Sequence, residues 1–477
     1  MLGRTRGIHF VGVGGIGMSG IAELLTNLGY DVSGSDVRRS RVTERLARLG
    51  VRISIGHDAS NVGGADVVVV SSAIMAGNPE TVEANRRQIP VIPRAEMLAE
   101  LMRLRYGIAI AGAHGKTSTT SMVALVLERA GLDPTAVIGG RLSAFGSNAR
   151  LGRGDYMVAE ADESDRSFLK LSPAIAVITN IDREHMESYG SWDDLRQAFV
   201  DFANKVPFYG AVIACADDEA VRGILPRVTR RLTTYGLADD DDRASANVSG
   251  HGMALEAFGS RAVVRYRTPE TDVELGELRL RVPGRHNLLN ALAAIAVSIE
   301  VGIPFPAAAD ALGKFQGAER RFQLLGEEDG VMVVDDYGHH PTEIAAVIAA
   351  ARAGIDRRVV VVFQPHRYSR TQMLMEEFGE ALGAADEIVL TDIYAAGEPA
   401  IPGITLDALA SVVRSAARRD VHVVPSVDDL PEAVAALSRQ GDLVITLGAG
   451  SIGTAGDRIL EAIRNRRAQP AANGQRP

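Results

Sequence analysis

The sequence has a single cysteine, few aromatic residues and no long apolar run. Because Cys215 cannot form an intramolecular disulfide, nothing in the chain requires an oxidising compartment. No apolar run approaches the roughly 18 residues that cross a bilayer. The apolar stretch 8–13 follows Arg4 and Arg6 as in a signal peptide, but it runs at once into glycines, which favours a first strand. We therefore expect a cytoplasmic protein.

Charge and composition narrow the class of partner. The 477 residues carry 51 basic and 60 acidic side chains, a formal net charge of -9, and 46% of them are hydrophobic. This apolar content excludes a disordered or collagen-like chain, and the length suggests about three domains. Mild acidity without basic blocks argues against a nucleic-acid or membrane surface. We expect small-molecule partners and a monomer or homodimer.

The order of elements predicts an α/β protein. Strand-like segments alternate with helical ones over the first hundred residues, which predicts a parallel sheet covered by helices. A second unit begins with a strand at 106–111, and alternating segments from about 232 to 282 predict a small antiparallel sheet. A third unit follows a charged, glycine-flanked linker at 326–330 and alternates again.

Gly12, Gly14 and Gly17 form a G-x-G-x-x-G pattern between a predicted strand and a predicted helix. With Asp36 at the end of the next strand, this is the dinucleotide-binding fingerprint, in which glycines let the backbone approach a pyrophosphate at the helix N-terminus. A structural turn is the plainer alternative. The pattern predicts a diphosphate ligand without deciding which one, and read alone it indicates a nicotinamide-dependent enzyme.

A second glycine-rich loop spans residues 112–118, Gly-Ala-His-Gly-Lys-Thr-Ser. It lacks the first glycine of the strict G-x-x-x-x-G-K-[ST] pattern, since Ile110 takes that place, but it keeps the chemistry: backbone N–H groups cradle phosphates, Lys116 offers its ammonium, and Thr117 can bind magnesium. Lysine otherwise occurs only at 170, 205 and 314, and arginine supplies 47 of the 51 basic residues. A lysine kept at this position therefore predicts an ATP site.

Polar residues follow the next two predicted strands of this unit. The strand at 156–159 leads into the acidic run 160–165, where Glu160 has the position of a magnesium ligand, although a solvated loop is the alternative. The strand at 174–179 is followed by His185. Because the carboxyl ends of parallel strands meet at one edge, we expect His185 near Thr117 and Glu160, as a candidate ligand for a second metal.

These motifs together resemble the Mur ligase family. The blocks 12–20, 112–118 and 160–165 carry the resemblance, and the blocks 283–290, 335–342 and 363–371 are similar to its alanine-adding branch. The resemblance covers nearly the whole chain and implies three domains: an N-terminal Rossmann-like UDP-binding domain (1–105), a central P-loop ATPase-like domain with a small antiparallel sheet (106–325) and a C-terminal Rossmann-like domain (326–467). Residues 468–477 are expected to form a disordered tail.

The resemblance also implies a reaction in peptidoglycan precursor synthesis, that of an acid–amino-acid ligase. The muramoyl carboxylate of UDP-N-acetylmuramate attacks the γ-phosphate of ATP. The amine of L-alanine then displaces phosphate from the acyl phosphate. ATP is thus a substrate and Mg²⁺ the expected cofactor, and the first loop is reassigned from a nicotinamide dinucleotide to the pyrophosphate of the UDP-sugar.

The roles of individual residues follow from the resemblance. The residues expected at the UDP-substrate are Gly12, Gly14, Gly15, Ile16, Gly17 and Asp36. Those expected at ATP are Gly112, Ala113, His114, Gly115, Lys116, Thr117, Ser118, His286, Asn287, Asn290 and Asp335. The metal ligands expected are Thr117, Glu160 and His185, and the catalytic residues Lys116, His185 and Arg320. The amino-acid side is assigned to His339, His340, Arg367 and Arg370. Spacing leaves Arg321 and Asp336 as equal claimants to the places of Arg320 and Asp335.

Three alternatives stay open at this point. A recycling ligase that attaches a preformed tripeptide to the same UDP-sugar would share the first two loops. A nicotinamide-dependent oxidoreductase would explain the first loop but leave the second without a purpose. A non-catalytic nucleotide-binding switch would use the second loop alone.

Overall fold

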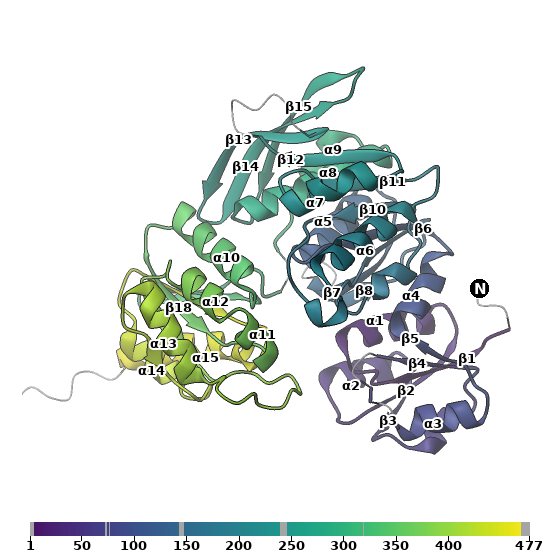
Figure 1. The fold of residues 1–477 in the computed structure, drawn as a ribbon, viewed down its shortest axis with the longest axis horizontal. Helices are drawn as coiled ribbons and strands as arrows, with labels where there is room; N and C mark the ends of the chain where they lie inside the picture. The colour runs from purple at the N-terminus through teal and green to yellow at the C-terminus, as the bar shows by residue number, and fades with distance from the viewer. Residues whose placement is uncertain are drawn as a thin grey trace, which may run out of the picture. The chain divides into compact units, whose positions relative to one another are not determined.

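The structure, a computed structural model, describes residues 4–71, 74–75, 77–142, 147–238, 246–317 and 319–468. It contains three sheets of five, ten and six strands, each with helices, so the α/β class is confirmed (Figure 1). Two compact units divide the chain. The first comprises residues 1–253, 261–280 and 287–316, and the second comprises 254–260, 281–286 and the chain from 317 onward.

The first sheet is parallel throughout, in the order β3-β2-β1-β4-β5. One face, with Ile8 and Phe10, packs on α1 and α4, and the other, with Val11 and Val68, packs under Ala84 of α3. Two covered faces are what a parallel sheet requires. The elements are β1 (Gly7–Val11), α1 (Ile16–Asn27), β2 (Asp31–Asp36), α2 (Arg41–Arg48), β3 (Arg52–Ile55), β4 (Val67–Val70), α3 (Pro79–Arg86), β5 (Val91–Pro93) and α4 (Arg94–Met102).

The second sheet has the strand order β15-β14-β13-β12-β11-β10-β6-β9-β7-β8. Its first half consists of β6 (Tyr106–Ala111), α5 (Lys116–Arg129), β7 (Thr135–Leu142), β8 (Ser147–Arg150), β9 (Tyr156–Glu160), β10 (Ile175–Ile178), α6 (Trp192–Asn204), β11 (Ala211–Cys215) and α7 (Glu219–Ile224). The strands β12 (Leu232–Leu237), β13 (Val248–Glu256), β14 (Gly259–Arg267) and β15 (Asp272–Leu280) follow, then α8 (Arg285–Glu300) and α9 (Phe305–Leu312). β6 pairs in parallel with β9 and β10, so the loops after these three strands share one edge.

The antiparallel part expected from the sequence is present, but it is smaller than expected and is not a separate sheet. The short connections between β13, β14 and β15 allow only antiparallel neighbours. β12, which we expected among them, instead pairs in parallel with both β11 and β13. Alternation along a strand reports which face is buried, not which way its neighbours run, so sequence could not separate the two cases.

The third sheet has the order β16-β17-β21-β18-β19-β20 and is covered on both faces. It contains β16 (Gln323–Glu328), β17 (Val331–Asp336), α10 (Pro341–Gly354), β18 (Arg358–Phe363), α11 (Tyr368–Met373), α12 (Met375–Leu382) and β19 (Glu387–Leu390). The rest is α13 (Leu406–Ala417), β20 (His422–Val423), α14 (Leu430–Leu437), β21 (Asp442–Leu447) and α15 (Ala455–Ala468).

The segment 326–330, expected as a linker, is instead the end of β16 and the turn into β17. The two strands pair antiparallel, and Asp329 and Gly330 between them have φ values of 51° and 71°. Two positive φ angles and an Asp-Gly pair are typical of a type I′ hairpin turn. The domain boundary expected at 325/326 therefore falls inside a strand, and the domain limits stay a prediction. Of the expected tail, residues 469–477 lie outside the described residues.

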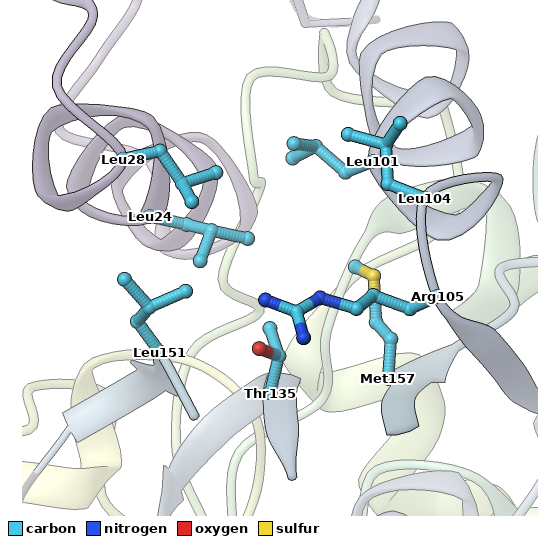
Figure 2. Close-up of a pocket in the computed structure, with 8 residues that line it drawn as sticks. All are labelled: Leu24, Leu28, Leu101, Leu104, Arg105, Thr135, Leu151 and Met157. Atoms are coloured by element: carbon cyan, nitrogen blue, oxygen red, sulfur yellow. The ribbon is translucent and has the colours of Figure 1, made fainter. Parts of the chain in front are cut away.

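An apolar pocket of about 250 Å³ lies where α1 and α4 meet the second sheet (Figure 2). It is lined by Leu24, Leu28, Leu101, Leu104, Arg105, Thr135, Leu151 and Met157. None of these residues belongs to the expected site. In the described parts of the chain, no helix combines the length and apolar character that crossing a bilayer requires.

Candidate functional site

The first glycine-rich loop is held by the end of the neighbouring strand. Gly12 has a φ of 80°, a conformation that favours glycine. The amides of Gly12 and Val13 each donate to the carbonyl of Ser35 at 2.9 Å, and the amide of Gly14 donates to Oδ2 of Asp36, also at 2.9 Å. Gly15 precedes α1, and Ile16 is its first residue. The structure thus brings the loop and Asp36 together, as the fingerprint predicts.

At two points of this loop the neighbouring side chains leave no room for a Cβ unless they move. A Cβ on Gly14 would lie 2.7 Å from Oδ2 of Asp36, and one on Gly17 would lie 2.2 Å from a guanidinium nitrogen of Arg94. Arg94 also approaches Asp162, in the acidic run that follows β9, at 3.2 Å. A basic side chain therefore lies between the start of α1 and the acidic run after β9.

The second loop connects β6 to α5 and is fixed from the end of β10. The carbonyl of His114 accepts hydrogen bonds from Thr179 Oγ1 at 2.7 Å and from Asn180 Nδ2 at 2.9 Å, and its amide donates to Asn180 Oδ1 at 2.8 Å. The His114 ring contacts Asp182 at 2.9 Å. Gly115, with a φ of 79°, directly precedes α5, so the loop opens on a helix N-terminus, the geometry that receives phosphate groups.

Lys116 points back into this loop. Its ammonium donates to the carbonyls of Gly112 at 2.6 Å and Ala113 at 3.2 Å, and to both carboxylate oxygens of Glu163 at 3.0 and 2.8 Å. Burial opposes the charged form, but the carboxylates of Glu163, Asp162 and Glu184 outweigh it and raise the pKa of Lys116. The site therefore holds a full positive charge at the mouth of the loop.

In the pair of Lys116 and Glu163, burial affects the pKa of Glu163 more than the charge of Lys116 does. Glu163 is 3% exposed, and burial raises its pKa to about 6, although Lys116 acts in the opposite direction. Tyr189 donates its hydroxyl to the carbonyl of Glu163 at 2.5 Å, which fixes the backbone at this point. A carboxyl group with its pKa near neutrality beside a lysine is typical of a functional site.

Three potential metal ligands gather at the same edge. Ligand atoms of Glu163, Glu184 and His185 all lie within 4.8 Å of one another. His185 has a φ of 54°, an uncommon left-handed conformation that turns the chain just after β10. Two carboxylates suit a hard divalent ion such as Mg²⁺, and an imidazole is an acceptable further ligand for several divalent metals.

The other expected metal ligands lie on the elements that border this cluster. Thr117 is the second residue of α5, and Glu160 is the last residue of β9, paired with Ile110 of β6. Both are partly exposed. Sequence analysis singled out Glu160 from the acidic run and missed Glu163 and Glu184. The acidic composition of 160–165 was the available signal, but only the fold shows which of its carboxylates meets His185.

Asn290 of α8 is distant in sequence from the second loop but contacts it within the same unit. Its Oδ1 accepts the Thr119 hydroxyl at 3.1 Å, and a Cβ on Gly115 would come within 2.6 Å of it. Asn287 is buried one turn earlier on the same helix. The expected ATP residues 112–118, Asn287 and Asn290 therefore lie on elements that meet at the start of α5.

An open hollow of about 830 Å³ continues from this edge. It is lined by Ile181, Asp182, Arg183, Trp192, Arg196, Asp218, Glu219, Ala220, Arg222 and Gly223. Asp182, which contacts His114, joins the hollow to the loop. The guanidinium of Arg183 lies over the Trp192 ring, at 5.4 Å from its centroid.

In the second unit, Asp335 and Arg320 form an ion pair. Nε of Arg320 donates to Oδ2 of Asp335 at 2.7 Å, and Nη2 donates to the carbonyl of Gly448 at 2.6 Å. Thr446 donates its hydroxyl to the other Asp335 oxygen at 2.7 Å. Arg320 has a φ of 57°, so the turn that presents it is a strained one for a residue with a side chain.

Asp336 and Arg321 are the residues that sequence spacing left as alternatives to Asp335 and Arg320. Their surroundings differ from those of that pair. The Asp336 carboxylate accepts the amides of Phe322 and Gly338, both at 2.7 Å, and burial raises its pKa to about 6. Arg321 pairs with Glu343 at 3.3 Å. Burial, and to a smaller extent the charge of Arg321, lower the pKa of His286 to about 4, so this histidine is neutral near pH 7. These contacts give Asp336 a clear role in shaping the turn after β17.

The expected amino-acid side contains a stack of rings. His339 meets Tyr337 and His366 edge to face at 5.4 and 5.5 Å, and His366 stacks on Tyr394 at 5.6 Å. Burial, and next His339, lower the pKa of His366 to about 3. His340, which is buried, caps α10. His366 lies in the block 363–371, but no sequence pattern predicted a role for it.

Arg367 and Arg370 stand at the start of α11. Arg367 precedes the helix with a φ of 72°, donates its amide to the carbonyl of Tyr394 at 2.8 Å and approaches Glu398 at 3.8 Å. Ser369 donates both its amide and its hydroxyl to Glu398. The structure thus ties Arg367 to the ring stack through Tyr394, while the expected role of the two arginines at a substrate stays a prediction.

Three family models match successive parts of the chain. Residues 7–106 match the Mur ligase family catalytic domain, residues 110–298 the Mur ligase middle domain, and residues 320–450 the glutamate ligase domain of Mur ligases. The three matches follow one another in the order in which the three sheets occur.

Individual relatives agree with the family models. The chain is 57% identical over 459 residues to a UDP-N-acetylmuramate–L-alanine ligase of Anaeromyxobacter dehalogenans, covering 96% of this chain and 98% of the relative, and 54% identical to one of Geotalea daltonii, covering 97% and 99%. Its fold is similar to the crystal structure of UDP-N-acetylmuramate-alanine ligase from Thermotoga maritima, with a TM-score of 0.80, 29% identity and coverage of 98% and 100%. With matches along nearly its full length, the chain belongs to the Mur ligase family.

Proposed function

We propose that this chain joins L-alanine to the muramoyl carboxylate of UDP-N-acetylmuramate at the expense of ATP, in the cytoplasm, as a step of peptidoglycan precursor synthesis. The observation that carries the proposal is the near full-length identity of 57% to a ligase of that name, in a chain whose second loop holds a partly buried lysine against an acidic edge. Because Mur ligases use ATP as a substrate, we assign the second loop to ATP binding.

In this proposal the two loops receive the two phosphorylated substrates. The amides at the N-terminus of α1 hold the pyrophosphate of the UDP-sugar, and Asp36 orients the loop through Gly14. The amides of 112–118 hold the phosphates of ATP, and Lys116 neutralises the charge that develops on the phosphoryl group in transfer. Both loops lie in the first unit.

A divalent ion, for which we propose Mg²⁺, fits the acidic edge. Thr117 and Glu160 would hold one ion, and His185 would hold a second together with Glu184 or Glu163, whose ligand atoms already converge. When bound, the ions offset the repulsion between the substrate carboxylate and the γ-phosphate. The chain's own contribution is to place these ligands and Lys116 on one rigid sheet edge.

The second unit supplies the amino-acid side in this proposal. Arg320 and Asp335 would face the nucleotide, and His339, His340, Arg367 and Arg370 would line the pocket for L-alanine. The ring stack of His339, His366 and Tyr394 stiffens that region. A neutral His366 adds no further positive charge beside the two arginines, which in this proposal bind the carboxylate of the amino acid.

Phosphate release measured with two amines, L-alanine and the preformed tripeptide, tests the proposal. With UDP-N-acetylmuramate, ATP and Mg²⁺ present, we expect release with L-alanine and none with the preformed tripeptide. The tripeptide-adding alternative has weaker support, since the murein peptide ligase from Psychrobacter arcticus matches at 24% identity and shares the fold alone, with a TM-score of 0.70. Turnover with the tripeptide but not with L-alanine would reverse the assignment, and turnover of NAD(P)H without ATP would support an oxidoreductase.

A further inference from the structure

A cluster of polar side chains lies beneath α3, on a face of the first sheet that is otherwise apolar. His9 is 1% exposed, and Ser35 and Glu80 are 0% exposed. His9 pairs in register with Ser33, so both side chains and that of Ser35 point to this face, on which Val11 and Val68 also lie. Burying a carboxylate costs several kcal/mol unless its oxygens are hydrogen-bonded. Packing alone therefore does not explain why these polar side chains are buried together.

Glu80 is the centre of this cluster. The Ser35 hydroxyl donates to Oε2 at 2.6 Å, and Asn61 Nδ2 donates to Oε1 at 2.6 Å. Nδ1 of His57 lies 3.1 Å from Oε2 and also 3.0 Å from the Ser35 hydroxyl, and Nε2 of His9 approaches to 3.7 Å. Each carboxylate oxygen thus has a short hydrogen bond from a different segment of the domain.

The segments that Glu80 joins are those that shape the first loop. The carbonyl of Ser35 accepts the amides of Gly12 and Val13. Asn61, on its other side, also donates to the carbonyl of Gly56 at 3.3 Å, whose amide donates to the carbonyl of Asp36 at 2.8 Å. A side chain from α3 therefore fixes, through one hydroxyl and one amide, the ends of β2 and β3 at the edge where a ligand of a parallel sheet binds.

We propose that Glu80 is a positioning residue for the UDP-substrate: its carboxylate holds Ser35, whose carbonyl accepts the amides of Gly12 and Val13 and so sets the course of the loop that leads to the pyrophosphate site at the start of α1. Glu80 itself is buried and touches no substrate. This proposal rests on the proposed function of the first loop. It predicts that weakening the cluster impairs binding of the UDP-sugar selectively and leaves the ATP loop, on another sheet, unaffected.

Steady-state kinetics of E80Q and S35A test the proposal. E80Q keeps the shape but turns one acceptor oxygen into a donor, so that Ser35 or Asn61 loses its acceptor. S35A removes the hydroxyl and keeps the backbone carbonyl. In both we expect the KM for UDP-N-acetylmuramate to rise about tenfold, while the KM for ATP and kcat at saturation change less than about twofold. Because S35A leaves the carboxylate in place, it carries the test even if E80Q does not fold.

Two matched variants separate positioning from charge and from stability. E83Q makes the same change on α3 at the surface, where Glu83 pairs with Arg86 and Arg87, and V32A weakens the core at the opposite end of β2. Neither is expected to raise the KM for the UDP-sugar. An unchanged KM in both E80Q and S35A, or an equal rise in V32A at a similar melting temperature, would overturn the proposal.

Calorimetry with UDP alone distinguishes this proposal from the proposed function. If the wild-type chain binds UDP but does not release phosphate with L-alanine, the function is wrong and the comparison of UDP affinity between wild type, E80Q and S35A still decides the role of Glu80. If the wild type binds no UDP, the assignment of the first loop fails and the proposal falls with it. If all three bind UDP equally, Glu80 does not position the loop.

Discussion

The ammonium of Lys116 lies 2.8 Å from Oε2 of Glu163, a carboxylate that is 3% exposed. Together with the carbonyls of Gly112 and Ala113, this contact occupies the lysine inside its own loop. A phosphate that binds the loop can attract the ammonium only by competing with Glu163. The pair therefore holds the charge in place at the loop until an anion binds.

Replacing Lys116 by alanine should stop ATP-driven turnover and leave binding of the UDP-sugar nearly intact. The loss of the ammonium removes the charge that stabilises phosphoryl transfer, so we expect kcat to fall on the order of a thousandfold. The UDP loop lies on a different sheet, so the Kd for UDP-N-acetylmuramate should change less than about twofold. Phosphate release and calorimetry measure the two effects.

The matched control for this variant is K170A. Lys170 is one of the four lysines and forms an exposed pair with Glu96 at 3.4 Å, so its removal should affect neither kcat nor UDP binding. A folded K116A protein that has lost UDP binding would contradict the assignment of the two substrates to separate loops.

Single substitutions of glutamate by glutamine can separate the roles of the expected metal ligands. Glu163, Glu184 and His185 converge, whereas Glu160 ends the neighbouring strand, so we expect E160Q and E184Q each to raise the Mg²⁺ concentration needed for half-maximal turnover at least about tenfold. E163Q should in addition lower kcat, because it removes the partner of Lys116. Turnover measured against Mg²⁺ concentration separates these outcomes.

Asp193→Asn is the control for this series, because Asp193 is an exposed carboxylate, 79% exposed, in the first turn of α6. It should not shift the Mg²⁺ dependence. If E184Q behaves like D193N, the cluster of Glu163, Glu184 and His185 does not bind the ion.

Arg320 and Arg321 are adjacent in sequence but should respond differently to substitution by alanine. Arg320 pairs with Asp335 and reaches the carbonyl of Gly448, and its removal should lower kcat about tenfold or more if it contacts ATP phosphates. Arg321 pairs with Glu343 beneath the turn, so R321A should lower stability by about 1–2 kcal/mol and change kcat less. Phosphate release and thermal unfolding of both variants measure the contrast, and the reverse pattern would exchange their roles.

The sequence was sufficient for features that depend on local chemistry. Gly12 and Gly115 lie at left-handed turns between a strand and a helix, and the fold places them as the motifs predict. The pairing direction of β12 and the convergence of Glu184 on Glu163 depend on contacts between distant segments, which no local pattern contains. The segment 326–330 was misread because an Asp-Gly hairpin turn and a polar linker have the same composition; the positive φ of Asp329 distinguishes them.

The pH dependence of stability should also report the buried carboxylate of Glu80. Burial raises its pKa, but the nearby His9 and the hydrogen bonds from Ser35 and Asn61 outweigh this and lower the pKa from an ordinary 4.5 to about 2. The unfolded chain therefore takes up this proton first. The stability contributed by the carboxylate is complete above pH 4.5 and is lost as the pH falls towards 2.

Comparison with E80Q isolates this effect from other titrating groups, including His9, His57 and Asp58, which lie near Glu80. Wild type should lose about 1 kcal/mol more than E80Q between pH 7 and pH 3.5, so the stability gap between them should narrow by that amount. The gap between wild type and V32A should stay constant, because Val32 carries no proton. Thermal unfolding across this range measures both gaps, and parallel loss in wild type and E80Q would mean that folding does not lower the pKa of Glu80.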